Sequence, residues 1–168
     1  MRIQETILRI RQLHDGQYDK GGQPYWRHPV RVMLRLGPKA HQYIREAALL
    51  HDVVEDCGVT LSDIHQAGYS HITLTIVELL SRRPGESYGA FIDRLIASKH
   101  GEAMQVKLAD LYDNTAPGRV AALPKEYEWI GKRYGQAIER LEGLIPIQRR
   151  VGMIVGDMND IDWSKYGN

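Results

Sequence analysis

Cysteine is almost absent from this sequence, because Cys57 is the single thiol among 168 residues. One thiol cannot form a disulfide within the chain, so no covalent cross-link stabilises the fold. Disulfides are typical of oxidising compartments. The near-absence of cysteine therefore predicts a protein that works in the reducing cytoplasm.

Long apolar runs and an excess of charge are absent as well. No stretch approaches the roughly 18 apolar residues that a membrane-spanning helix needs, and residues 1–14 lack the apolar core of a secretory signal. The 22 Lys and Arg nearly balance the 21 Asp and Glu, for a net charge of +1. This balance argues against nucleic acid or a membrane surface as a partner, but it allows a local pocket for a small anion.

β-Alternation, internal repeats and low-complexity linkers are also lacking, whereas helical periodicity dominates. With 43% apolar and 26% charged residues, the composition is that of an ordinary globular domain. Ala47, Leu50, His51 and Val54 share one helix face by their spacing. We predict one all-α domain over residues 1–168. The expected helices cover about 1–14, 29–36, 39–56, 60–67, 72–80, 87–98, 102–114 and 124–141, with a last helix after Pro146 and an irregular tail.

The stretch "AALLHDVVEDC", residues 47–57, places His51 and three carboxylates in an apolar helix. Unpaired buried charges are costly, which suggests that a metal cation neutralises them. Residues four apart lie one above the other on a helix, so Glu55 sits one turn from His51 and Asp56 one turn from Asp52. The pair Glu55 and Asp56 could equally be a solvated helix end. As a set, the residues predict two ligands and two carboxylates near a metal-bound water.

Two further ligand candidates stand elsewhere in the chain. His28 lies at a loop-to-helix junction before Pro29, and Asp110 interrupts an apolar helix face as His51 does. Two imidazoles and two carboxylates without a thiolate suit Mn²⁺, Fe²⁺, Zn²⁺ or Mg²⁺ with open positions for water and substrate. We therefore predict that His28, His51, Asp52 and Asp110 bind one divalent ion.

Each candidate also has a purely structural interpretation when it is taken alone. His51 could be a hydrogen-bonded core histidine, and His28 could cap its helix. Asp110 could pair with Lys107 or an arginine, and Lys107 could instead assist phosphate binding. The joint pattern favours the metal site.

Several stretches together resemble the HD-type hydrolase domain of the RelA/SpoT superfamily, in particular the stand-alone small alarmone hydrolases similar to the metazoan SpoT homologue. They are "HDGQYDKGGQPYWRHP", "ALLHDVVED", "ELLSRRPGESYGAFIDRL", "VKLADLYDNT" and "RYGQAIERL", in the expected order over roughly residues 10–141. The resemblance implies an all-α HD-domain bundle with a metal site in its core cleft. It also implies Mn²⁺-dependent hydrolysis of the 3′-pyrophosphate of (p)ppGpp, giving GDP or GTP and pyrophosphate. No synthetase domain fits into the remaining residues.

The resemblance also implies roles for individual residues. Glu55 and Asp56 match paired catalytic acids that orient and deprotonate the attacking water. Lys20 matches a basic loop residue beside the nucleotide base, and Asn114 matches a residue that contacts the sugar region. The same four ligand candidates match the family's metal ligands. Some members act as antitoxins, so a cognate toxin is one candidate partner, and a homo-oligomer is another.

The sequence departs from the family pattern at Asp19, where an arginine is usual, and at Ser81, where a threonine is usual. An anion at position 19 should weaken phosphate contacts and leave Lys20 to hold the base by stacking. Adenine alarmones then become credible substrates beside guanine ones. Alternatively, Asp19 faces solvent and Lys20 is a surface charge, in which case the loop does not meet the nucleotide.

Two other functions are compatible with the motifs. One is another HD-type phosphohydrolase, such as a nucleotidase or an NADPH 2′-phosphatase. The other is a non-catalytic module that senses a nucleotide. Glu55 and Asp56 argue against the sensor, because binding alone has little need of a general base.

Overall fold

The computed structural model describes residues 2–127, 129–150 and 152–167, and this part of the chain is all-helical, as predicted. The described segments form no β-strand, and Tyr18 and Pro24 make one isolated bridge. No described helix is long and apolar enough to cross a bilayer. The elements in chain order are α1 Arg2–Leu13, α2 Arg27–Arg35, α3 Gln42–Leu50, α4 Val53–Asp56, α5 Leu61–Gln66, α6 His71–Leu80, α7 Tyr88–Ala97, α8 Gly101–Asn114, α9 Pro117–Ala121, η1 Lys125–Tyr127, α10 Trp129–Leu144, α11 Ile147–Arg150 and η2 Trp163–Tyr166.

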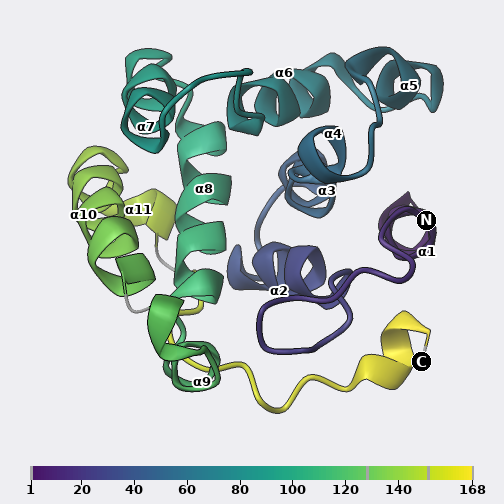
Figure 1. The fold of residues 1–168 in the computed structure, drawn as a ribbon. Coiled ribbons are helices and arrows are strands. Elements are labelled where there is room, and N and C mark those ends of the chain that lie inside the picture. The colour runs from purple at the N-terminus through teal and green to yellow at the C-terminus, as the bar shows by residue number, and fades with distance from the viewer. Residues whose placement is uncertain (1, 128, 151, 168) are drawn as a thin grey trace.

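Helix α8 stands at the centre of the bundle, where it contacts α2, α3, α6 and α10 (Figure 1). It is surrounded because its apolar residues do not keep to one side: Ala103, Val106, Leu108 and Leu111 are all fully buried. A helix that is apolar around most of its circumference belongs in the interior. Two carboxylates of α8, Asp110 and Asp113, are thereby held inside the bundle.

The helix starts follow the capping signals in the sequence. The Thr60 hydroxyl oxygen accepts a hydrogen bond from the Asp63 amide, and the Asp63 carboxylate accepts one from the Thr60 amide. The pair forms a capping box at the start of α5, where the sequence predicts a helix. Ser70 and Ser87 cap α6 and α7 through their side chains. These caps satisfy backbone amides that the first turn of a helix leaves without a partner.

The continuous helix predicted for residues 39–56 is wrong, because the chain turns at His51 and Asp52 between α3 and α4. The Ala48 carbonyl, which would accept the Asp52 amide in a continuous helix, instead accepts the His51 Nδ1–H at 2.7 Å. Asp52 takes φ −102° as the chain leaves the helix. This turn directs His51 and Asp52 toward the same point.

Two predictions near the C-terminal third also need correction. No helix was predicted between residues 114 and 124, but Pro117 opens the short helix α9 at its first position. After Pro124 the chain forms η1, Glu128 lies outside the described residues, and α10 continues to Leu144, beyond the expected end at Leu141.

The irregular C-terminal segment crosses beneath α9 and α2 to reach α1, and is drawn in yellow in Figure 1. Arg35 holds it, donating from Nη1 to the Gly156 carbonyl at 2.9 Å. Trp163 then packs edge-on against Trp26 with ring centroids 5.5 Å apart. The segment therefore runs alongside α2, from Arg35 at its last residue to Trp26 just before its first.

Candidate metal centre and its cleft

Three of the predicted ligands form a compact buried cluster. His28 on α2, His51 in the turn after α3, and Asp110 on α8 place one donor atom each within 4.8 Å of one another. His28 Nε2 lies 3.1 Å from Asp110 Oδ1, and His51 Nε2 lies 3.7 Å from the same oxygen. These side chains are 4–6% exposed. Helices distant in sequence therefore bring two imidazoles and a carboxylate to one point.

Asp52, the fourth predicted ligand, borders the same cluster. Its Oδ2 lies 3.1 Å from His51 Nε2 and 3.6 Å from His28 Nε2. The Tyr25 hydroxyl donates to this oxygen at 2.7 Å and holds the carboxylate in place. The structure thus brings all four predicted side chains together, and their role as ligands stays a prediction.

The cluster has the chemistry of a divalent-cation site. His51 Nε2 is buried and has no hydrogen-bond partner among the described residues, a role that a bound cation would fill. Its other ring nitrogen is bound to the Ala48 carbonyl, and His28 Nδ1 donates to Asp113 Oδ2 at 2.8 Å. Metal-binding histidines characteristically use one nitrogen in this way, so that the other faces the ion. The donor set and its support fit a divalent cation.

Electrostatics inside the cluster favour positive charge. Burial lowers the pKa of His51, but the carboxylates of Asp52 and Asp110 outweigh it and raise this pKa well above its ordinary value. Burial raises the pKa of Asp110, whereas Lys107 and the two histidines hold it well below its usual range. A cation at this cluster would compete with protons for the same nitrogens and oxygens, so we expect metal affinity to fall as the pH is lowered.

Asp113 was not predicted from the sequence, although it stands three residues after Asp110 on the same helix. Its side chain is fully buried, and besides His28 it accepts hydrogen bonds from Arg31 Nε at 2.9 Å and Arg35 Nε at 3.0 Å. Arg119 Nη1 adds a contact of 2.9 Å. Burial raises the pKa of Asp113, but His28 and the guanidinium groups lower this pKa by more than burial raises it. The carboxylate therefore remains ionised. The signal for this residue was the i+3 spacing from Asp110 inside "KLADLYDN".

We expect Asp113→Ala to destabilise the protein strongly, because it leaves buried guanidinium groups without their carboxylate. Breaking a buried ion pair by removing one partner costs about 3–5 kcal/mol. Asp113→Asn keeps an acceptor for His28 and should fold better, yet lower metal affinity by about 10- to 100-fold. Thermal unfolding and metal titration of both variants check this; equal melting temperatures for wild type and Asp113→Ala would contradict the ion-pair argument.

A cavity of about 370 Å³ opens beside the cluster. Its described lining residues are Tyr18, Asp19, Lys20, Tyr25, His28, His51, Asp52, Glu55, Leu80, Arg82, Tyr88, Phe91, Lys107, Asp110, Asn114, Arg119, Leu123, Ile130 and Tyr134. The lining combines the carboxylates and imidazoles of the cluster with aromatic and aliphatic side chains and several cations. The cleft can therefore accept a ligand with an anionic end and a planar, apolar end.

Cationic and aromatic side chains contact one another around Lys20 and Tyr88, which line this cleft, and of this group the sequence had indicated only Lys20. Lys20 Nζ lies 4.4 Å from the ring centre of Tyr127 and 5.5 Å from that of Trp129. The Arg133 guanidinium lies 4.5 Å from the Trp129 ring and 5.5 Å from the Tyr88 ring. These distances are typical of cation–π contacts. Only the tertiary structure joins the glycine-rich loop to α10 and α7.

Lys107 and Asn114, predicted to contact substrate, both line the cleft and both hold Asp110. Lys107 Nζ donates to Asp110 Oδ2 at 2.7 Å, and Asn114 Nδ2 donates to Asp110 Oδ1 at 2.6 Å. The alternative pairing of Asp110 with Lys107 is therefore present together with the cluster. Each side chain orients a candidate metal ligand, and their contact with substrate stays a prediction.

Glu55 and Asp56, the predicted catalytic acids, differ in position. Glu55 lines the cleft and accepts the Arg82 amide at 2.9 Å, whereas Asp56 is not among the described lining residues. Burial and the nearby Asp52 carboxylate raise the pKa of Asp56. Gln17 donates to the Asp56 backbone carbonyl at 3.2 Å, which ties this turn to the loop before α2. Of the two acids, Glu55 is therefore the one that a molecule bound in the cleft would contact directly.

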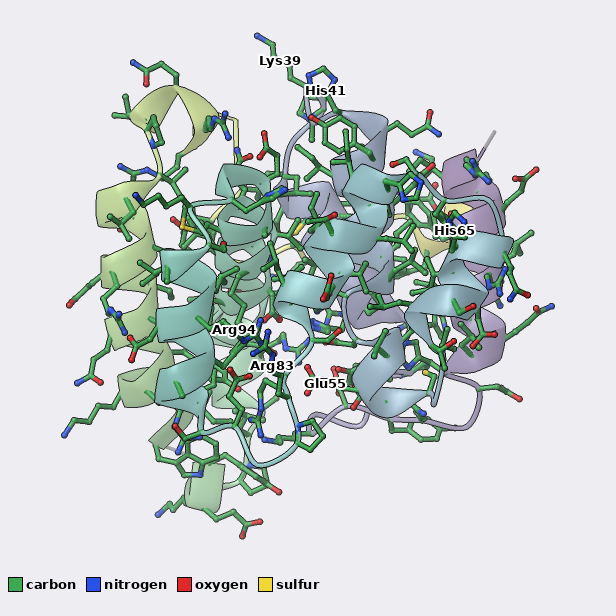
Figure 2. All side chains as sticks on the ribbon, turned by 90° about the horizontal axis from the view of Figure 1, so that it is seen from above. Lys39, His41, Glu55, His65, Arg83 and Arg94 are labelled. Carbon is green, nitrogen blue, oxygen red and sulfur yellow. The ribbon has the colours of Figure 1, made fainter. Side chains whose placement is uncertain are left out.

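The loop after α6 is fixed at the mouth of the cleft by one arginine. Arg94 donates to the Ser81 carbonyl at 2.9 Å and to both carboxylate oxygens of Glu86. Glu86 also accepts the Arg83 amide at 3.0 Å, and these contacts hold the pKa of Glu86 down at about 2. Figure 2 shows Arg83 and Arg94 together near Glu55, seen from above. The departure at Ser81 thus leaves the loop anchored through backbone atoms.

Asp19, where the family carries arginine, points inward and not into solvent. Its side chain is 6% exposed, and its Oδ1 accepts the amides of Gly21 at 3.0 Å and Gln23 at 2.9 Å. Its Oδ2 lies 3.5 Å from Arg119 Nη1 and 3.8 Å from Arg31 Nη2. Asp19 therefore shapes the turn and neutralises nearby guanidinium charge, which the sequence interpretation as a repulsive group had missed.

We expect Asp19→Arg to destabilise the protein and not simply to tighten substrate binding. The change removes the acceptor for two loop amides and places a third cation beside Arg31 and Arg119. Loss of such hydrogen bonds costs about 0.5–1.5 kcal/mol each. Asp19→Asn keeps an acceptor and is the matched control. A melting temperature of Asp19→Arg equal to that of Asp19→Asn would refute this expectation.

Comparison with known proteins now becomes informative. No family model matches the chain. It is 31% identical over 162 residues to the probable GTP pyrophosphokinase of Mycobacterium leprae, covering 90% of this chain and 19% of the relative. It is 35% identical over 79 residues to the guanosine-3′,5′-bis(diphosphate) 3′-pyrophosphohydrolase of Vibrio cholerae, covering 46% of this chain and 11% of that protein. It is 41% identical over 66 residues to the bifunctional (p)ppGpp synthase/hydrolase SpoT of Escherichia coli, covering 39% of this chain and 9% of the relative.

A solved structure decides the fold. A metazoan orthologue of SpoT, described as hydrolysing ppGpp, superposes with a TM-score of 0.69 at 20% identity, over 90% of this chain and 91% of the other. The chain has the SpoT-type hydrolase fold. The resemblance inferred from the sequence motifs is thereby confirmed, and so is the all-α HD-domain class. Because the chain spans less than a fifth of the curated relatives named above, their whole-protein activities do not transfer directly.

Proposed function

We propose that this SpoT-type domain hydrolyses the 3′-pyrophosphate of a purine alarmone, (p)ppGpp or its adenine counterpart, with a divalent cation and water. The observation that supports it is the lining of the cleft. It holds the buried cluster of His28, His51 and Asp110 together with Lys20 and several aromatic rings. A nucleotide 3′-pyrophosphate likewise combines a polyanion with a planar base. The relatives named as 3′-pyrophosphohydrolases support this assignment.

The reaction consumes one water and breaks the bond between the ribose 3′-oxygen and phosphorus, which releases pyrophosphate and GDP or GTP. A divalent cation supplies Lewis acidity and neutralises phosphate charge. His28, His51, Asp52 and Asp110 would hold it, and Asp113 fixes the ring of His28. Lys107 and Asn114 keep Asp110 oriented from the other side. These side chains together prepare the site before substrate arrives.

Glu55 and Asp56 are the groups that we assign to the water proton. Glu55 faces the cleft beside Asp52, and its hydrogen bond to the Arg82 amide restrains its carboxylate. A carboxylate placed within hydrogen-bond reach of the attacking water acts as a general base. Asp56, one residue on, would orient the water or take over the proton.

The aromatic side chains of the cleft would hold the nucleoside. Lys20 and the Tyr88 and Tyr134 rings line it, and the Tyr88 hydroxyl is buried without a hydrogen-bond partner in the part of the chain that the structure describes. Stacking on such groups accepts any purine, because every base offers a π-face. The site would therefore admit both guanine and adenine alarmones.

The remaining features of the function are part of the same proposal. Mn²⁺ is the native ion that we propose, with other divalent cations able to replace it, because the ligands are imidazole and carboxylate without a thiolate. A cytoplasmic location, a cognate toxin and a homo-oligomer stay predictions.

A product-resolved screen tests the function. Purified chain, stripped of metal and supplied with Mn²⁺, Mg²⁺ or Zn²⁺, is incubated with ppGpp, pppGpp, ppApp, NADPH and nucleoside monophosphates. We expect equimolar GDP and pyrophosphate from ppGpp, only with added metal. Orthophosphate from NADPH or a monophosphate would favour another HD phosphohydrolase. Tight ppGpp binding without turnover in metal-loaded protein would favour the sensor.

A further inference from the structure

A second cavity, of about 350 Å³, lies on the other side of the Asp19 loop, between α2, α9 and the C-terminal segment. Figure 1 shows this segment passing beneath α9 and α2. We call it the arginine cavity, and its charged lining residues are Arg27, Arg31, Arg35, Arg119, Asp19, Asp113 and Asp157. It shares Asp19, Arg119 and Leu123 with the lining of the cleft described above, and Asp113 is its one lining residue with a part in the proposed hydrolysis, through His28.

Two guanidinium nitrogens at this cavity lack any hydrogen-bond partner. Arg27 Nε and Arg31 Nη2 are both buried and both without an acceptor among the described residues. Arg31 as a whole is only 9% exposed, and the nearest carboxylate oxygen to its Nη2, on Asp19, lies at 3.8 Å. That distance exceeds a hydrogen bond. A buried charged donor left without a partner is costly, and it often marks the place of a bound ion or molecule.

The acidic residues around the cavity do not satisfy these nitrogens. Asp113 is already bound to Arg31 Nε, Arg35 Nε, Arg119 and His28, and Asp19 Oδ1 is bound to two loop amides. Asp157 accepts the Gly118 amide at 2.8 Å. The cavity therefore combines unmet donors with carboxylates that are already engaged.

We propose that the arginine cavity is a binding site for a phosphate-type oxyanion. The planar guanidinium fork matches the tetrahedral oxygens of phosphate in geometry and charge, and such pairs are among the strongest hydrogen bonds in proteins. The volume admits inorganic phosphate or pyrophosphate beside Arg27 and Arg31. The anion would give both unpartnered nitrogens an acceptor.

The experiment must separate this site from the cleft, which also attracts phosphate. The full chain, with divalent metal removed by chelation, is titrated with phosphate, pyrophosphate and GDP, and with chloride as a reference anion. Calorimetry gives affinity, and ¹⁵N NMR of the arginine side chains reports which Nε groups respond. The compound with the highest affinity among phosphate, pyrophosphate and GDP indicates which of them carries the phosphate group that the site binds.

Two variants change the affinity in opposite directions if the proposal holds. Arg27→Gln should weaken phosphate binding about tenfold, because a charge-assisted donor is lost. Asp157→Asn should tighten it about threefold, since the amide oxygen still accepts the Gly118 amide while the negative charge is gone. Arg11→Gln is the matched control, because Arg11 also stacks on Trp26, at 4.9 Å, but does not line the cavity.

The result that overturns the proposal is equal phosphate affinity in wild type, Arg27→Gln and Asp157→Asn, which would place the anion elsewhere. Absence of saturable binding up to about 50 mM would overturn it too. Because Arg27 also lies over the Trp163 ring at 4.9 Å, its variant is checked by thermal unfolding. If Arg27→Gln does not fold, the Asp157→Asn affinity alone decides.

Discussion

Asp52→Ala is expected to abolish metal binding and hydrolysis together. Asp52 Oδ2 lies within 3.6 Å of both histidine Nε2 atoms, so its loss removes one anionic donor from the cluster. Substitution of residues that only support the metal ligands typically lowers metal affinity by 10- to 100-fold. For Asp52, a predicted ligand, we expect a loss of at least about 100-fold. Metal titration by calorimetry and turnover of ppGpp at saturating Mn²⁺ measure the two effects.

Asp52 is a sharper choice than Asp110 for this test. The Asp52 side chain is 20% exposed, whereas Asp110 is 6% exposed and pairs with Lys107. Removing Asp110 would leave a buried ammonium group without its carboxylate and would unfold part of the protein. Asp15→Ala, an exposed carboxylate outside the cleft, is the control. Wild-type metal affinity in Asp52→Ala would show that the cluster is not the metal site.

Glu55→Gln is expected to keep the metal and lose turnover. The glutamine oxygen can still accept the Arg82 amide, which Glu55 accepts at 2.9 Å, so the local structure remains while the base is removed. General-base catalysis contributes about 10²- to 10⁴-fold, and the loss should appear in kcat. Single-turnover hydrolysis with metal content measured on the same sample checks this.

Asp56→Asn separates the roles of the two acids. Because Glu55 lines the cleft and Asp56 does not, we expect a smaller loss for Asp56→Asn than for Glu55→Gln. Glu5→Gln on α1, an exposed acid, controls for general charge effects. The catalytic assignment would be wrong if neither change slowed hydrolysis by about tenfold.

Local signals in the sequence were sufficient for much of the fold. The helices predicted at about 60–67 and 102–114 depend on neighbouring residues, such as the capping pair Thr60 and Asp63, and both are confirmed as α5 and α8. The prediction of an unbroken helix through His51 is wrong because hydrophobic periodicity does not reveal that a side chain hydrogen-bonds to a backbone carbonyl of its own helix. The Ala48 carbonyl is bound by the His51 ring, and the helix ends there.

The ligand candidates could also be found in the sequence, because His51, Asp52 and Asp110 interrupt apolar faces where an unpaired polar group is costly. Their convergence with His28 was inferred from matching chemistry, since spacing along the chain says nothing of distances between α2, α3 and α8. The family motifs supported the same residues without supplying a geometry.

Only the tertiary structure decided which side chains support and surround the site. Asp113 looks like an ordinary surface acid of α8 until Arg31, Arg35 and Arg119 are seen to enclose it. Asp19, which the sequence suggested would repel phosphate, turns out to bind loop amides. Contacts of this kind join residues far apart in the chain, and they depend on how helices pack. The sequence alone determined which chemistry is available, and the packing of the helices determined where each group is held.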